Sequence, residues 1–180
     1  MAPTPDRGPR LGLVVGLCLV VAGAGVAVFA LLASSESAPP PPPAKAIASA
    51  LESARPASEG FIGYPETELA LGDDCLRVAV ADDEAERGQG LRGRDLGPYD
   101  GMLFVNESDT TAAYTMSGVT VPLDIGWYTH DGEPVDRTEM EPCPEGGPDC
   151  PLYSADSSYR FALETLRGEL PTGSLGGCPS

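Results

Sequence analysis

The chain has 180 residues, 42% of them hydrophobic, and 11 basic against 27 acidic side chains give a formal net charge of −16. This length fits one modest domain with appendages, and the charge argues against a nucleic-acid partner, because phosphate backbones are bound mainly by basic side chains. Lys45 and His130 are the only lysine and histidine, which removes most side chains used in Schiff-base, phosphate-loop or histidine-based catalysis.

An uncharged apolar segment, residues 11–33, lies close to the N-terminus. At about 1.5 Å per helical residue it is long enough to cross a hydrocarbon core of about 30 Å. Arg7 and Arg10 precede it, so the positive-inside rule places residues 1–10 in the cytoplasm and everything after Ala33 outside. We therefore predict a single transmembrane helix, a signal-anchor that attaches the chain to the cell membrane.

The alternative for this segment is a cleaved secretory signal, since Ala30 and Ala33 are small residues near its end. The apolar part of a signal peptide is usually about 7–15 residues, so the length favours the uncleaved anchor. Residues 34–60 are rich in Pro, Ala and Ser and are expected to form a linker. Within them, Ala44–Arg55 has a helical pattern that would be marginally stable alone.

Residues 61–180 are expected to form one extracytoplasmic domain. They carry 23 acidic and 7 basic side chains, and 7 − 23 = −16 accounts for the whole net charge. Short apolar runs separated by Gly, Pro and Asp predict a mainly β domain, a small β-sandwich or barrel-like fold with one or two short helices. The runs are Leu76–Ala81, Met102–Val105, Ala112–Met116, Leu123–Tyr128, Pro134–Met140 and Tyr159–Thr165.

Two local patterns refine this prediction. The segment Thr129–Glu133 contains an Asp-Gly pair between two of the apolar runs, which is a strong signal for a β-hairpin turn. The acidic segment Ala81–Gly88 is typical of a short helix, with Asp82 or Asp83 as its N-cap and acidic residues in the first turn.

Besides Cys18 in the apolar segment, the chain has Cys75, Cys143, Cys150 and Cys178. An even number in an oxidising compartment predicts two disulfides, with three possible pairings. The short Pro/Gly-rich segment between Cys143 and Cys150 favours that pair, which leaves Cys75 with Cys178. A four-cysteine zinc site is the alternative, but zinc sites usually present tight Cys-x-x-Cys pairs, which this sequence lacks.

Four ordered motifs within Leu69–Leu175 resemble the uncharacterised prokaryotic family catalogued as domain of unknown function 192. The resemblance implies a small, mostly β, sandwich-like domain, often behind a signal peptide or an anchor, with no established biochemical role. The motifs are RGQGLRGRDLGPYDGMLFV (Arg87–Val105), YTMSGVTVPLDIGWYTHDGEPV (Tyr114–Val135), MEPCPEGGPDCPLY (Met140–Tyr153) and FALETLRGEL (Phe161–Leu170).

The resemblance also transfers individual motif positions to this chain. If the family motifs line a common site, this member has lost or altered its ligand, because several positions depart from the family pattern. The matched positions are Gly90, Leu91, Arg94, Gly101–Phe104, Met116 and Pro122–Asp124. The departures are Arg92 in place of Met, and Thr115, Ser117, Gly118 and Val119 in place of the Trp, Lys, Asn and Thr around Met116.

Arg94, Asp100, Met116 and Asp124 form the candidate ligand-binding or structural cluster. The three charged residues adjoin apolar segments, where a charge needs a partner. We expect Arg94 and Asp124 to pair at the edge of the core and to serve the architecture, with a ligand-facing cluster as the alternative.

The function expected from these observations is a membrane-tethered binding or accessory module of the cell envelope, acting on an envelope protein or a small ligand. The alternatives are an extracytoplasmic enzyme with an Arg/carboxylate site and a structural envelope protein. Catalysis is the weaker hypothesis, because no nucleophile motif such as Gly-x-Ser-x-Gly occurs. No cofactor or metal is expected, since His130 fits a solvated turn. The domain would be periplasmic in a Gram-negative source, or secreted if the signal were cleaved.

Overall fold

The protein was analysed as a computed structural model that describes residues 42–58 and 60–178. Within these two ranges, no helix is long and apolar enough to cross a membrane. The predicted transmembrane segment, residues 11–33, lies outside the described residues, so it stays a prediction.

The described chain contains two short helices and ten strands, which confirms the expectation of a mainly β domain. Five of the six apolar runs correspond to the longer strands, and the run Ala112–Met116 contains a two-residue strand. The elements are α1 (Pro43–Glu52), β1 (Arg55–Pro56), β2 (Pro65–Leu71), β3 (Asp74–Ala81), α2 (Glu84–Gln89), β4 (Gly101–Thr110), β5 (Tyr114–Thr115), β6 (Leu123–Tyr128), β7 (Pro134–Met140), β8 (Leu152–Tyr153), β9 (Tyr159–Leu166) and β10 (Leu175–Gly176).

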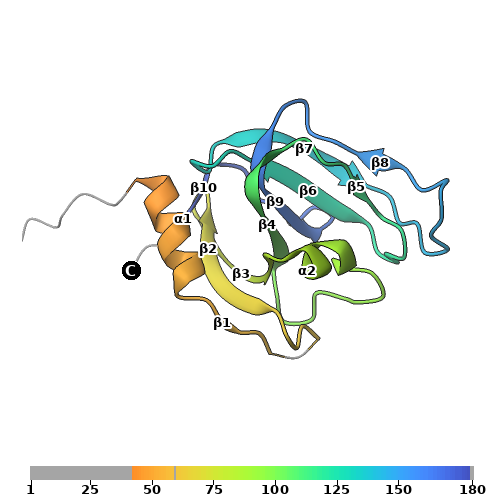
Figure 1. Cartoon of the computed structure of the whole chain (residues 1–180), viewed down its shortest axis with the longest axis horizontal. Helices are drawn as coiled ribbons and strands as arrows, with labels where there is room; N and C mark the ends of the chain where they lie inside the picture. The colour runs from red at the N-terminus through yellow and green to blue at the C-terminus, as the bar shows by residue number, and fades with distance from the viewer. Residues whose placement is uncertain (1–41, 59, 179–180) are drawn as a thin grey trace, which may run out of the picture. The chain divides into compact units, whose positions relative to one another are not determined.

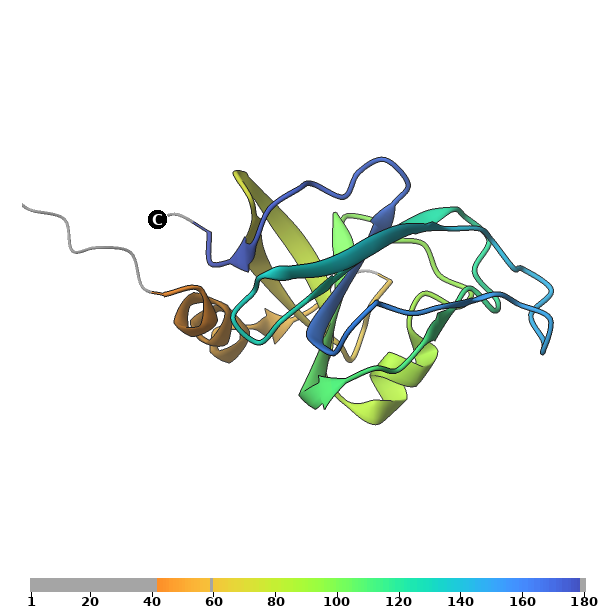
Figure 2. The same ribbon diagram turned by 90° about the horizontal axis from the view of Figure 1, so that it is seen from above.

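The main sheet is mixed and has the order β1-β2-β3-β4-β9-β6-β7, with β10 also paired to β2 (Figure 1). The β3–β4 pair is parallel, and α2 lies in the connection between these strands; the other pairs are antiparallel. Strands β5 and β8 form a separate two-stranded sheet. The main sheet is curved, and Figure 2 shows the yellow β2 and β3 strands crossing the direction of the teal β6 and β7 strands.

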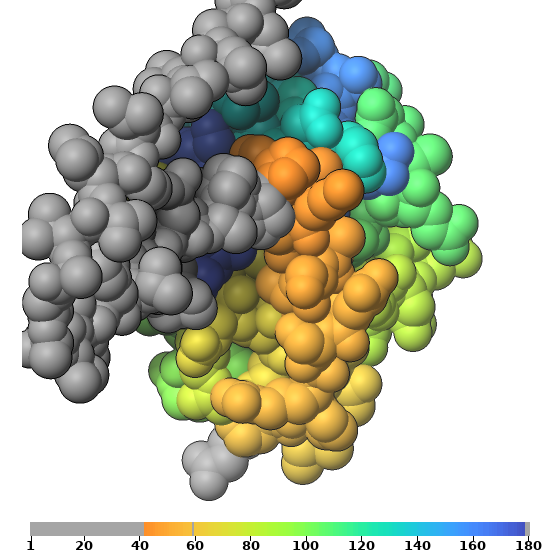
Figure 3. Space-filling model, turned by 90° about the vertical axis from the view of Figure 1, so that its left-hand side faces the viewer, coloured from red at the N-terminus to blue at the C-terminus, as the bar shows by residue number. Residues whose placement is uncertain are grey.

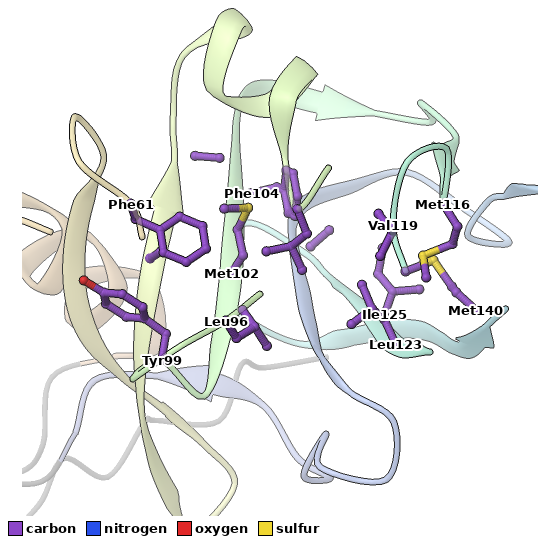
Figure 4. Packing of buried hydrophobic residues seen from close by; sticks show 14 of the residues in the cluster. Phe61, Leu96, Tyr99, Met102, Phe104, Met116, Val119, Leu123, Ile125 and Met140 are labelled. Carbon is purple, nitrogen blue, oxygen red and sulfur yellow. The ribbon is translucent and has the colours of Figure 1, made fainter. Parts of the chain in front are cut away.

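Both faces of the central strands β3, β4, β6 and β9 are largely buried, which explains why these strands contain nearly continuous apolar runs. Successive side chains of a strand point to opposite faces, so Met102 and Phe104 of β4 enter one core while Leu103 enters the other. The first core contains the only tryptophan, Trp127, and is covered by residues that follow α2 and β5 (Figure 4). The second core is covered by α1 and β10.

Helix α1 belongs to the folded domain, although the sequence analysis assigns its residues to the linker. Ile47 is buried in the second core, and the Thr67 hydroxyl of β2 donates a hydrogen bond of 2.8 Å to the Ala50 carbonyl. Figure 3 shows α1 in orange on the outer surface, with the following orange and yellow segment below it. Packing against the sheet supplies the stability that this ten-residue helix would lack alone.

The predicted hairpin turn joins β6 and β7, and the Thr129 amide donates a 2.9 Å hydrogen bond to the Glu133 carbonyl. Gly132 has φ +82, and a Cβ atom there would meet the carbonyl oxygen of Leu175. The Leu175 amide in turn donates to the Gly132 carbonyl at 2.7 Å. Curvature of the sheet thus brings this turn against β10, and only glycine permits so close an approach.

Helix α2 begins at the predicted N-cap, Asp83. The Asp83 carboxylate accepts from the Glu86 amide at 2.8 Å, and the Glu86 carboxylate accepts from the Asp83 amide at 3.4 Å. These two bonds form a capping box. The helix ends before Gly90, whose φ of +50 turns the chain toward the sheet.

The structure joins the cysteines in the two pairs that the sequence favours. Cys75 and Cys178, 5.5 Å apart between Cα atoms, form what we name the terminal disulfide, which closes a sequence separation of 103 residues. Cys143 and Cys150, 5.9 Å apart, form the loop disulfide over 7 residues.

Candidate functional site

Arg94 and Asp124 do not form the expected ion pair. Arg94 is half-buried, donates to the Gly60 carbonyl at 2.9 Å, and lies over the rings of Tyr64 and Phe61 at 4.9 and 5.5 Å from their centroids. The buried Asp124 in β6 instead accepts a 2.8 Å hydrogen bond from the Gly168 amide. The two side chains have separate partners: aromatic faces and a carbonyl contact the arginine, and the Gly168 amide binds one oxygen of the carboxylate, whose other oxygen is buried without a hydrogen-bond partner among the described residues.

The other two candidate residues are also isolated from this pair. Asp100 is exposed, and its carboxylate accepts from the Arg77 amide at 2.7 Å, which holds the start of β4 beside β3. Met116 is buried in the first core, where Figure 4 shows it beside Met140. The four candidates therefore serve separate structural contacts and do not form one cluster.

The positions that depart from the family motifs lie closer to a site. The amide of Gly93, next to Arg92, donates to the Gly118 carbonyl at 3.0 Å, and a Cβ atom at Gly118 would contact the Arg92 side chain. Thr115, Val119 and Arg92 line a common cavity. Three of the five departures thus border one concave region of the domain.

This cavity, which we name the Glu164 pocket, has a volume of about 360 Å³. It lies between the α2 segment, strands β4 and β9 of the sheet, and the chain around β5. Exposed side chains form its rim, whereas Glu164 and aromatic rings form its interior. The lining residues are Glu84, Arg87, Gly88, Gln89, Gly90, Leu91, Arg92, Phe104, Asn106, Ala112, Ala113, Tyr114, Thr115, Val119, Tyr159 and Glu164.

Glu164 is the unusual member of the lining. It lies in the middle of β9, opposite Met102 of β4 and Ile125 of β6, and it is 5% exposed. Burial alone raises the pKa of its carboxyl to about 8, and no hydrogen bond or charged group of the described chain offsets this effect. A carboxyl that is neutral at pH 7 therefore lies at the inner end of the pocket.

Three aromatic residues, Phe104, Tyr114 and Tyr159, line the same pocket. The Tyr114 ring makes edge-to-face contact with Phe104 at 5.1 Å and lies 6.3 Å from Tyr159. Burial is the main cause that raises the pKa of the Tyr114 hydroxyl, and the neighbouring Tyr159 and then Glu164 add to the effect. The Tyr159 hydroxyl donates to the Ala112 carbonyl at 2.6 Å, which fixes the chain that closes the pocket.

The remaining polar lining residues are engaged with the backbone. One nitrogen of the Arg87 guanidinium donates to the carbonyls of Asp82 and Val105 at 2.6 and 3.0 Å. The Asn106 amide donates to the Arg160 carbonyl at 3.1 Å. These bonds attach α2 and β4 to neighbouring strands and hold the walls of the pocket in place.

A second buried carboxylate, Glu66 of β2, has the opposite character. It accepts hydrogen bonds from the Tyr99 hydroxyl at 2.6 Å, from Arg55 at 2.8 Å and from Arg77 at 2.7 Å. The Tyr99 bond, followed by the arginines, lowers the pKa of Glu66 to about 2. A carboxylate with this many partners is a structural anchor, which joins β1 to the sheet.

In the part of the chain that the structure describes, no group of three or more His, Cys, Asp or Glu side chains is placed to hold a metal ion. His130 is exposed in the hairpin turn, as expected for a solvated position.

Comparison with known proteins adds the family. The family model of domain of unknown function 192 (DUF192), described as "Uncharacterized ACR", matches residues 67–174. The chain belongs to the DUF192 family. The match spans most of β2 to the residues just before β10, so it includes the whole Glu164 pocket.

Two solved structures share the fold of this DUF192 domain. One is a protein of unknown function from Novosphingobium aromaticivorans, 23% identical over 70% of this chain and 95% of that chain, with a TM-score of 0.56. The other is a putative transcription regulator from Sinorhizobium meliloti, 23% identical over 61% of this chain and 90% of that chain, with a TM-score of 0.51. No curated protein matches the chain.

Glu164 is not among the candidate residues predicted from the sequence, where it lies within the apolar run Tyr159–Thr165. The signal was present, because Glu164 is the only acidic residue in that run. A lone carboxyl in a strand buried on both faces needs either a partner or a function. Which of these applies depends on the tertiary neighbours of Glu164, and these come from distant segments.

Proposed function

We propose that this DUF192 protein is a membrane-tethered, extracytoplasmic module that binds a small ligand in the Glu164 pocket. The observation that carries the proposal is a concave site of about 360 Å³ with a buried, unpartnered carboxyl and aromatic walls. Ligand sites in proteins are typically concave, largely apolar and furnished with a few polar groups.

The location rests on the sequence and on the cysteines. The apolar segment 11–33 and the preceding Arg7 and Arg10 support a single-pass anchor with the domain outside. Disulfides persist in oxidising compartments, and both pairs of cysteines in the domain are bonded. The proposed setting is therefore the outer side of the cell membrane.

Binding explains the pocket better than catalysis does. A carboxyl whose pKa lies near neutrality can act as a general acid or base, and this property of Glu164 is the observation that favours the enzyme alternative. The lining residues, however, include no serine, cysteine or histidine, and Glu84, the other carboxyl among them, is exposed at the rim. A buried carboxyl in a pocket with aromatic walls is sufficient for recognition.

Native mass spectrometry of the full-length protein in non-ionic detergent tests the ligand-binding role. After incubation with a library of small charged and neutral compounds, we expect a bound species in the wild type. Ala113→Trp at the rim fills the pocket and should abolish binding, whereas Asp73→Trp in the exposed β2–β3 turn should not. Absence of any bound compound, or equal binding by Ala113→Trp, would contradict the proposal.

The topology has its own test in spheroplasts of an expressing bacterium. We expect external protease to digest the domain and carbonate extraction to leave the anchor in the membrane fraction. A domain that is protected from protease, or a soluble chain that begins near Ser34, would contradict the tethered arrangement.

A further inference from the structure

We propose that the Glu164 pocket is selective for an organic ammonium cation, with the carboxylate of Glu164 as its counter-charge. This inference rests on the proposed ligand-binding function and specifies the chemical class of the ligand. Two independent features carry it: a buried carboxyl without a partner among the described residues, and three aromatic residues that line the same pocket.

The carboxyl supplies the charge recognition. Buried carboxylates are normally paired with a cation or several donors, as Glu66 is in this domain. Glu164 is equally buried and has no such partner in residues 42–58 and 60–178. A cation entering the pocket would provide the missing partner in an environment where water screens the attraction poorly.

The aromatic walls of the pocket are the second feature that favours a cationic ligand. Cations bind to the faces of aromatic rings through the ring quadrupole, most strongly where water is excluded, and aromatic cages are a common solution for substituted ammonium groups. Phe104, Tyr114 and Tyr159 all line the pocket, and ring centroids of neighbouring pairs lie 5.1 to 6.3 Å apart. Alkyl groups on the cation would also fit such walls through apolar contact.

An anionic ligand fits the pocket less well. Arg92 is exposed at the rim, and Arg87 already donates to two backbone carbonyls. An anion near Glu164 would face a carboxyl with no compensating charge beside it. The chain as a whole has a net charge of −16, which raises the local concentration of cations.

Binding of a cation should release a proton from Glu164. The pKa of Glu164 is raised to about 8 in the empty domain, so below that pH the cation competes with a proton. Affinity should therefore increase roughly tenfold per pH unit up to about pH 8 and then level off. The other titratable groups that line the pocket are Glu84 and Arg87 of α2, Arg92 after it, Tyr114 of β5 and Tyr159 of β9.

A matched pair of probes tests the class directly. Choline and 3,3-dimethylbutan-1-ol have nearly the same shape, and only choline is charged. Isothermal titration calorimetry on the full-length protein in non-ionic detergent, at pH 6, 7, 8 and 9, should give choline an advantage of roughly tenfold or more at pH 8. That advantage should shrink toward pH 6.

Glu164→Gln keeps the shape of the side chain and removes its charge. We expect it to abolish both the preference for choline and the pH dependence, while the exposed Glu107→Gln on β4 leaves both unchanged. Fluorescence of the buried Trp127 verifies that each variant is folded. Tyr114→Leu removes a ring and keeps the Glu164 carboxyl, so it should lower the affinity for choline more than the affinity for the alcohol.

Each alternative outcome overturns the cation assignment. The assignment would be refuted if the two probes bound with equal affinity or if the alcohol bound more tightly. It would also be refuted if choline in about 50-fold excess failed to displace a bound library compound, or if Glu164→Gln bound choline as well as the wild type does. The ligand-binding function would still stand if the library experiment gave a neutral or anionic compound that Ala113→Trp fails to bind. The ligand-binding function itself would be contradicted if no library compound bound to the wild type at all.

Discussion

Replacing Glu164 by glutamine should change how the stability of the domain depends on pH. In the unfolded chain this carboxyl ionises around its ordinary pKa of 4.5, whereas burial raises the pKa to about 8 in the folded domain. Below pH 4.5 both states are protonated and Glu164 has no effect. Between pH 4.5 and 8 the unfolded state alone loses its proton, so stability falls as pH rises.

The magnitude follows from the width of this window. Each pH unit between the two pKa values lowers the free energy of unfolding by about 1.4 kcal/mol. At pH 7 the interval is 7 − 4.5 = 2.5 units, which corresponds to about 3 kcal/mol. Glu164→Gln cannot ionise, so it should be about 2–3 kcal/mol more stable than the wild type at pH 7 and within about 1 kcal/mol of it at pH 4.5.

Urea denaturation at pH 4.5, 5.5, 6.5, 7 and 8 measures this difference. Trp127, the only tryptophan, is fully buried in the first core, so its emission reports unfolding without a label. Glu107→Gln, at an exposed position of β4, is the matched control and should follow the wild type at every pH. Parallel pH profiles for Glu164→Gln and the wild type would show that the carboxyl is ionised in the folded domain and would refute the reasoning.

The other predictions concern the structural contacts. The pKa of Glu66 is lowered to about 2, so its stabilisation should be present above pH 4.5 and disappear as pH falls toward 2; Glu66→Gln should cost up to about 3 kcal/mol at pH 7 by urea denaturation. Removing the terminal disulfide with Cys75→Ser should cost about 4–5 kcal/mol, and removing the loop disulfide with Cys143→Ser about 2–3 kcal/mol, each measured against the oxidised wild type. Arg94→Ala and Asp124→Ala share no contact, so a double-mutant cycle should give a coupling below about 0.5 kcal/mol.

Much of the fold could be predicted because both faces of the central strands are buried. Strands such as β6 and β9 appear in the sequence as nearly uninterrupted apolar runs bounded by turn residues. Strand β2 was missed because Glu66 and Glu68 interrupt its apolar pattern. The buried Glu66 carboxylate is tolerated only because Arg55, Arg77 and Tyr99 reach it from other segments, and no local pattern contains that information.

The candidate site was less predictable for the same physical reason. A charge beside apolar residues shows that it needs a partner, but not which one: Arg94 contacts aromatic faces and a carbonyl, and one oxygen of Asp124 accepts from an amide. Glu164 is adjacent in sequence to ordinary strand residues. Its role as a candidate ligand group emerges only when α2 and the β5 segment are placed around it.

The position of β9 constrains when the domain can form. This strand comes late in the chain, after β8, yet in the sheet it lies between β4 and β6. Until residues 159–166 are available, β4 and the β6–β7 hairpin have no shared neighbour, and both cores stay incomplete. Pairing of segments so distant in sequence is slow and leaves apolar strand edges open to aggregation. A chain that stops after Met140 should therefore be a substrate for chaperones and proteases, because the sheet is complete only when β9 has been synthesised.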